Sequence, residues 1–107
     1  MVEISEDRLD AVFHALSDST RRTMLRLLAQ GECSIGELAA PFPMSFAGAS
    51  KHVKSLEQAG LVSRSVQGRN HVCRLEADAL GDAEDWLRFY EHFWSTRLEK
   101  DASRRPT

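Results

Sequence analysis

Apolar residues recur at three- and four-residue steps along most of this chain, which is the periodicity of amphipathic α-helices. The pattern predicts four helices before residue 60, and their ranges are 6–16, about 20–29, 34–40 and 45–58. Gly31 and Gly60 stand where the second and fourth of these helices are expected to stop. The pattern therefore favours a mainly α-helical fold.

A helix-turn-helix is predicted in the middle of the chain. Ser34 is followed three residues later by Glu37, which is the spacing of a capping box at a helix start. Pro41 and Pro43 disfavour the α conformation in the residues before them, so the short helix must end in a tight turn. Ser45 can then cap the longer helix. Many DNA-binding proteins have this arrangement, although other helical proteins contain similar corners.

The helix over 45–58 has two contrasting faces. The residues of its apolar face, which we expect to be buried, are Phe46, Ala49, Val53 and Leu56. The opposite face contains no acid and consists of Ala47, Gly48, Lys51, Lys54, Ser55 and Gln58. A face of small, polar and cationic residues suits the major groove of DNA. The alternative is an ordinary surface helix whose polar face is solvated.

After this helix the pattern changes to two short β-prone runs, 61–66 and 71–75. The four residues Gln67-Gly68-Arg69-Asn70 separate them and predict a hairpin turn. A hairpin directly after a helix-turn-helix is a wing, here with two strands. At its tip Arg69 can reach a phosphate or the minor groove, and the alternative is a solvated turn residue.

A last helix is predicted over 78–99, and its apolar stripe is rich in aromatic residues. Because a domain of this size has little remaining core to cover them, we expect the stripe and the first helix to pack against a second copy. Packing within one chain only is the alternative. The predicted interface residues are Leu9, Phe13, Trp86, Leu87, Tyr90, Phe93 and Trp94. Residues 1–99 are predicted to form one domain, and the polar tail 100–107 to be disordered.

The charge of the chain is unevenly distributed. Residues 45–74 contain five lysines and arginines against one glutamate, whereas residues 75–99 contain two arginines against seven acids. The overall net charge of −2 therefore hides a segment that suits an anion such as DNA. No apolar run approaches the roughly 20 residues that span a bilayer, and no signal pattern is present. Two cysteines make no disulfide framework, so a cytoplasmic location is expected.

Three motifs together resemble the ArsR/SmtB family, whose members are small homodimeric winged helix-turn-helix repressors of bacteria and archaea. The motifs are HALSDSTRR at 14–22, IGELA at 35–39 and ASKHVKSLEQAGLV at 49–62. The similarity extends over roughly residues 8–99. Ser19 departs from the family pattern, which usually has proline at this first helical position, and serine is tolerated there.

The resemblance implies that the helix over 45–58 is a recognition helix and that the terminal helices form a dimer interface. Twofold symmetry would then place two recognition helices on a palindromic operator, about one DNA turn apart. The residues expected to contact the groove or phosphates are Ser45, Ala47, Gly48, Ser50, Lys51, His52, Lys54 and Arg69. Ser50 and His52 lie at the margin of the outward face, so we expect them to contact the DNA backbone.

Many relatives in this family sense metals, which requires a separate test of the ligands. The Cys-x-Cys pair of the thiolate site aligns with Ser34 and Gly36, and Cys33 stands alone one residue out of step. The site on the last helix would need a second histidine and an acid, but only His92 is present and Ser95 occupies the acid position. We predict no metal and no cofactor, and any small-molecule effector stays unassigned.

No catalytic constellation is visible, so we predict a binding protein and no enzyme. The leading hypothesis is a dimeric, sequence-specific DNA-binding repressor. One alternative is a winged-helix protein–protein adaptor that does not bind DNA, and another is a repressor that responds to a metal or to oxidation through a non-standard site. The repressor is favoured over the adaptor by three cations on one surface, Lys51, Lys54 and Arg69, because an adaptor has no need of them.

Overall fold

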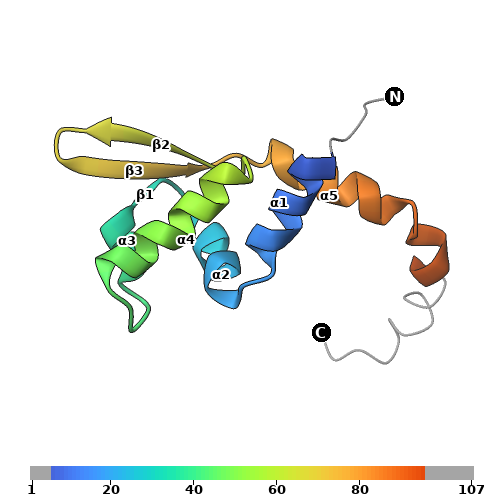
Figure 1. Cartoon of the computed structure of the whole chain (residues 1–107), viewed down its shortest axis with the longest axis horizontal. Helices are drawn as coiled ribbons and strands as arrows, with labels where there is room; N and C mark the ends of the chain where they lie inside the picture. Colours follow the sequence, from blue (N-terminus) through green and yellow to red (C-terminus); the bar gives the residue numbers. More distant parts are fainter. Residues whose placement is uncertain (1–5, 96–107) are drawn as a thin grey trace.

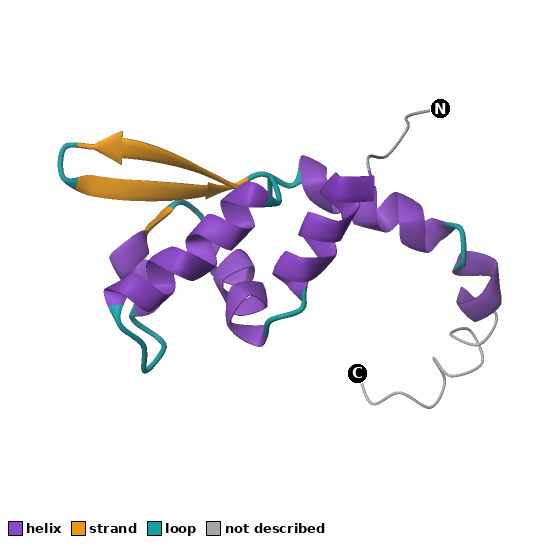
Figure 2. Ribbon diagram, viewed as in Figure 1, coloured by secondary structure: helices purple, strands orange, loops and turns teal. Residues whose placement is uncertain are grey.

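The computed structural model describes residues 6–95, and it consists mainly of helices with one small sheet (Figures 1 and 2). In chain order the elements are α1 (Glu6–Leu16), α2 (Ser19–Leu28), β1 (Cys33–Ser34), α3 (Ile35–Ala39), α4 (Phe46–Gln58), β2 (Val62–Gln67), β3 (Asn70–Leu75) and α5 (Asp78–Arg88). The hairpin of β2 and β3 projects at one end of the molecule, and α5 extends toward the other end (Figure 1). This arrangement confirms the predicted winged helix-turn-helix.

Side chains cap the starts of α2, α3 and α4. The side chain of Asp18 accepts a hydrogen bond from the Arg21 backbone N–H at the start of α2 (3.1 Å). Ser34 and Glu37 form the predicted capping box at the start of α3. At the start of α4 the Ser45 hydroxyl oxygen accepts from the Gly48 backbone N–H (3.0 Å). Each cap satisfies a backbone donor that the helix itself leaves free, so these boundaries follow from local sequence.

The sheet has one strand more than the predicted two-stranded wing. The strands β2 and β3 pair in antiparallel fashion from Val62 opposite Leu75 to Gln67 opposite Asn70, leaving a two-residue turn. Gly68 opens this turn with φ +64°, a left-handed conformation that glycine adopts without strain. The short strand β1 pairs with the other side of β3, which gives the order β1-β3-β2. Two residues are too few to show a period, so the pattern could not predict β1.

The core surrounds the inner face of α4. Ala49, Val53 and Leu56 are fully buried, as the apolar periodicity predicted. Phe46 contradicts the prediction, because 61% of its surface is exposed. It is the first residue of α4, directly after the turn, and on this face of the helix burial begins only at Ala49.

The last helix is shorter than predicted. The helix α5 ends at Arg88, residues 89–90 form a turn, and residues 91–95 are helical again (Figure 2). Ala79 and Ala83 of α5 are buried in the core, whereas Phe89 is 71% exposed. Among residues 89–93, which follow α5, every side chain is exposed, so little packing holds the helix together at this point. Residues 96–99 of the predicted helix, and the predicted disordered tail, lie outside the described residues.

Candidate nucleic-acid interface

The predicted contact residues gather on one helix, its cap and the wing turn. Ser45 is the N-cap of α4, and Ala47, Lys51 and Lys54 are exposed along it. Gly48, Ser50 and His52 belong to the same helix and are half-buried. Arg69 is exposed in the turn between β2 and β3. Seven of the eight residues therefore share α4 with its cap, and the eighth projects from a separate element.

The cations of the segment 45–74 fall into two groups. Lys51, Lys54 and Arg69 are exposed, and within residues 6–95 no ion pair involves any of them. Arg64 and Arg74 are each paired with a carboxylate, so they add little positive charge to the surface. The net charge of this segment, counted along the sequence, is therefore larger than the positive charge that its surface presents to an anion.

The paired arginines have structural roles around the wing. Arg64 of β2 donates to the Glu57 carboxylate of α4, and also to His71 Nδ1 of β3 at 3.3 Å. This ties the hairpin to the recognition-helix candidate. Arg74 of β3 donates to Glu32 Oε1 through both Nε (2.9 Å) and Nη2 (2.6 Å), and this hydrogen bond raises the pKa of Arg74. The wing is therefore held by ion pairs on both sides of the sheet.

Arg21 is a site residue that the sequence analysis missed. Although it is charged, only 8% of its surface is exposed. Its guanidinium reaches the end of α1 and also His52 on α4. A signal was present in the sequence, since position 21 lies three, four and seven residues before Met24, Leu25 and Leu28. These are the spacings of one helical face, so Arg21 lies on the apolar stripe.

A second candidate surface lies on α1, on α5 and on the residues directly after α5. Trp86, Leu87, Tyr90 and Phe93 are exposed, as is Phe89, which the prediction did not include. The rings of Phe13 and Trp86 meet edge to face with centroids 5.6 Å apart, and Trp86 lies 5.0 Å from Tyr90. Leu9, also a predicted interface residue, is buried within the protomer, so little of its surface is accessible to a partner.

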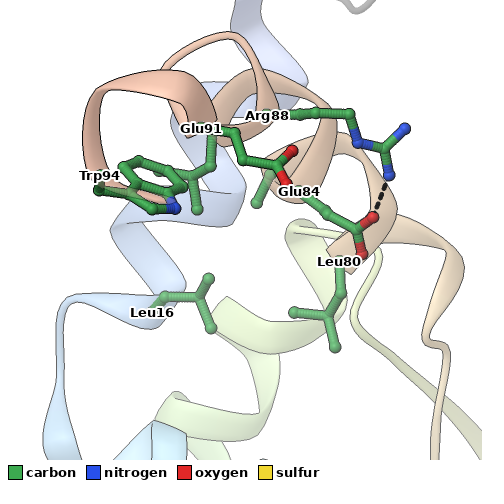
Figure 3. Close-up of a pocket in the computed structure, with 8 residues that line it drawn as sticks. Leu16, Leu80, Glu84, Arg88, Glu91 and Trp94 are labelled. Carbon is green, nitrogen blue, oxygen red and sulfur yellow. Dashed lines mark hydrogen bonds and ion pairs between the residues drawn. The ribbon is translucent and has the colours of Figure 1, made fainter. Parts of the chain in front are cut away.

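A cavity of about 590 Å³ lies between the end of α1, α5 and the residues after it. Figure 3 shows Leu16, Leu80 and Trp94 around it, with the Glu84–Arg88 ion pair at its rim. Leu87 also lines it. Of the predicted interface residues, Leu87 and Trp94 thus line a cavity, whereas Phe13, Trp86, Tyr90 and Phe93 form an aromatic cluster.

The two cysteines lie directly opposite each other, Cys33 on β1 and Cys73 on β3. Burial raises the pKa of both thiols, and for Cys33 the nearby Glu37 carboxylate adds to the effect. They are therefore less reactive than an ordinary thiol at neutral pH. Within residues 6–95, no three histidine, cysteine or acidic side chains come together in a way that could hold a metal. None of the helices in this range is long and apolar enough to cross a membrane.

Comparison with known proteins adds an independent observation. Residues 18–64 match the family model described as "Bacterial regulatory protein, arsR family". The chain is 34% identical to the transcriptional repressor SdpR of Bacillus subtilis, over 74% of this chain and 88% of that protein. It is 33% identical to an ArsR family transcriptional regulator of known crystal structure, RHA00566, with a TM-score of 0.80 over 88% of this chain and 97% of the other.

A solution structure is also similar, that of the homodimeric winged helix-turn-helix DNA-binding domain of Mb0332 from Mycobacterium bovis. The identity is 28% and the TM-score 0.64, over 89% of this chain and 95% of that one.

Proposed function

Because this chain belongs to the ArsR family of bacterial regulatory proteins, we propose that it is a homodimeric, sequence-specific DNA-binding repressor of transcription. In this proposal residues 1–99 form one winged helix-turn-helix domain with its dimerisation helices. It acts in the cytoplasm, as a DNA-binding protein without catalytic activity. No metal, cofactor or small-molecule effector is assigned to it.

The observation that carries the proposal is the distribution of unpaired cations. Lys51 and Lys54 project from α4 without a carboxylate partner in the described chain, while the neighbouring Arg64 and Arg74 are neutralised. Exposed lysines on a helix with small neighbours can reach the phosphates on the rims of the major groove. Arg69, in the wing turn, then contacts the adjacent backbone or minor groove.

The contact residues have different roles in this proposal. Ala47 and Gly48 have too little side chain to bond with bases, so they allow α4 to approach the groove closely. Ser45 caps the helix, and its exposed position suits a contact with a phosphate. Ser50 is half-buried at the margin of the face, which suits a contact with the DNA backbone.

Dimerisation places two copies of α4 on one duplex. The aromatic cluster on α1 and α5 is a large exposed apolar surface, and such surfaces on small proteins are usually covered by a partner. A second copy is the partner that the solved homodimeric relative suggests. A twofold axis through this surface then presents two recognition helices to a palindromic site with half-sites about one DNA turn apart.

The proposal is tested with the full-length protein and DNA from upstream of its own gene. Light scattering after size exclusion should give a dimer, and footprinting should show a protected palindrome. A fragment with one half-site inverted keeps the composition and length but breaks the symmetry, so it should bind more weakly. Equal binding to both fragments would reject recognition of the palindrome by a twofold-symmetric dimer. Absence of binding at low salt would favour the protein–protein adaptor.

A further inference from the structure

One buried guanidinium joins three helices behind the candidate DNA interface. The Arg21 Nε–H of α2 donates to the carbonyl oxygen of Ala15 at 2.8 Å, and Nη2–H donates to that of His14 at 2.9 Å. Both carbonyls lie in the last turn of α1. That of His14 also accepts from the backbone N–H of Ser17 (3.1 Å) and from its hydroxyl (2.6 Å). The remaining nitrogen, Nη1, is 3.2 Å from Nδ1 of His52 on α4. It also lies 4.0 Å from a carboxylate oxygen of Asp18, beyond hydrogen-bond distance.

The chemistry of the two groups decides where the imidazole proton resides. A guanidinium has only donors and does not deprotonate in proteins, so Arg21 must donate in this contact. Nδ1 of His52 must therefore be the acceptor, with its lone pair free of a proton. The neutral ring then carries its single proton on Nε2, because the hydrogen bond at one ring nitrogen sets the tautomer.

We propose that Arg21 is a positioning residue that holds His52 as the Nε2–H tautomer, so that α4 presents this N–H as a neutral donor to a DNA phosphate. The two nitrogens lie on different sides of the ring, so Nε2 points away from Arg21. His52 is half-buried and follows the exposed Lys51 along α4. The DNA part of this inference rests on the proposed function, whereas the tautomer does not.

The proposal distinguishes His52 from the lysines beside it. A neutral N–H that donates to a phosphate strengthens binding to every sequence alike, because phosphates carry no base identity. It releases no counterion, so it should not change the dependence of affinity on salt. Loss of this donor should weaken binding about tenfold or more per protomer, which is the scale of a hydrogen bond to a charged group.

The tautomer is measured first, in the DNA-free wild-type protein. Long-range proton–nitrogen NMR spectra at about pH 8 distinguish a protonated ring nitrogen from an unprotonated one. We expect Nε2 of His52 to be protonated and Nδ1 to be bare. Arg21→Lys keeps the charge but removes the planar fork, and it should give a mixture of tautomers. If that variant does not fold, Arg21→Gln replaces it. A protonated Nδ1 in the wild type, or an unchanged tautomer without Arg21, would overturn the proposal.

Two variants of His52 then test separately the roles of Nδ1, which contacts Arg21, and Nε2, which points away from it. Asparagine places its amide oxygen near the position of Nδ1, so H52N keeps an acceptor for Arg21 and loses the outward donor. Glutamine places its amide nitrogen near the position of Nε2, so H52Q keeps the outward donor and leaves Arg21 without its acceptor. We expect H52N to lose DNA affinity at nearly unchanged melting temperature. We expect H52Q to lose melting temperature and yet to retain more DNA affinity than H52N.

A merely structural role for His52 makes a different prediction, namely that affinity follows stability in both variants. That result, or wild-type affinity in H52N, would overturn the phosphate contact. The outcome is separate from the proposed function, because the wild-type protein must bind its palindrome in the same assay. Failure of the wild type to bind would reject the proposed function while leaving the tautomer measurement to decide the role of Arg21.

Discussion

Replacing one exposed lysine of α4 should flatten the salt dependence of DNA binding by a calculable amount. Lys51 and Lys54 are exposed and without ion pairs within residues 6–95, so each is available to neutralise a phosphate. The logarithm of the binding constant falls by about 0.9 per neutralised phosphate for each tenfold rise in salt. A dimer loses two such contacts per substitution, so Lys51→Ala or Lys54→Ala should reduce the slope by about 1.8.

The double variant makes the effect large enough to measure easily. Four lost contacts reduce the slope of log binding constant against log salt by about 3.6. Between 50 and 200 mM salt, the affinity of the wild type should therefore fall by roughly 150-fold more than that of the variant. Fluorescence anisotropy with a labelled palindromic duplex over a salt series gives both slopes. Both lysine substitutions should also weaken binding to unrelated sequences, because phosphate contacts are not sequence-specific.

Arg74→Gln is the matched control for these substitutions. It removes the same charge per protomer as one lysine substitution and comes from the same segment of the chain, but Arg74 is already paired with Glu32. We expect its slope to stay close to that of the wild type. Equal flattening by Arg74→Gln and Lys51→Ala would show that only total charge matters. Unchanged slopes in both lysine variants would refute the assignment of α4 to the DNA backbone.

Three further predictions concern the dimer, the caps and the thiols. Phe93→Glu should yield a monomer in light scattering, while Val66→Glu, which charges a comparably exposed apolar residue on the wing, should leave the dimer intact. The hydrogen bond from the Arg21 backbone N–H lowers the pKa of Asp18, so this carboxylate stabilises the fold at neutral pH and the contribution is lost as the pH falls through the lowered value. Asp18→Asn keeps a capping oxygen but cannot ionise, so its unfolding free energy should fall less steeply than that of the wild type between about pH 5 and pH 3. Urea titrations at each pH measure this, and a steeper fall in the variant would contradict the prediction. Burial raises the pKa of Cys73, so its alkylation by iodoacetamide should be slower than that of free cysteine at pH 7 and should accelerate on raising the pH, as followed by mass spectrometry.

The helix starts and the hairpin turn show how far local rules reach in this chain. Ser34 with Glu37, and Ser45, cap the helices that they were predicted to cap. Gly68 adopts the left-handed conformation that the hairpin turn requires. Each of these features involves groups within about four residues of one another. The winged helix-turn-helix could therefore be predicted from spacing alone.

The burial of particular side chains could not be predicted in the same way. Phe46 has the spacing of a core residue but lies at the uncovered start of α4, and the last helix ends at Arg88 where the core ends. Arg21 has the spacing of the apolar stripe, yet it is charged, and its burial is possible because the end of α1 and His52 satisfy its donors. In each case the deciding neighbour comes from another element.

The candidate DNA interface likewise has features that local sequence predicts and features that depend on contacts between distant segments. The sequence by itself determined that small residues and lysines share the outward face of α4, because helical periodicity alone places them there. Only the tertiary structure decided which cations remain available, since Arg64 and Arg74 meet carboxylates that lie 7 and 42 residues away in the chain. Ion pairing depends on distances of a few ångströms between distant segments, and a single sequence does not contain those distances until the chain has folded.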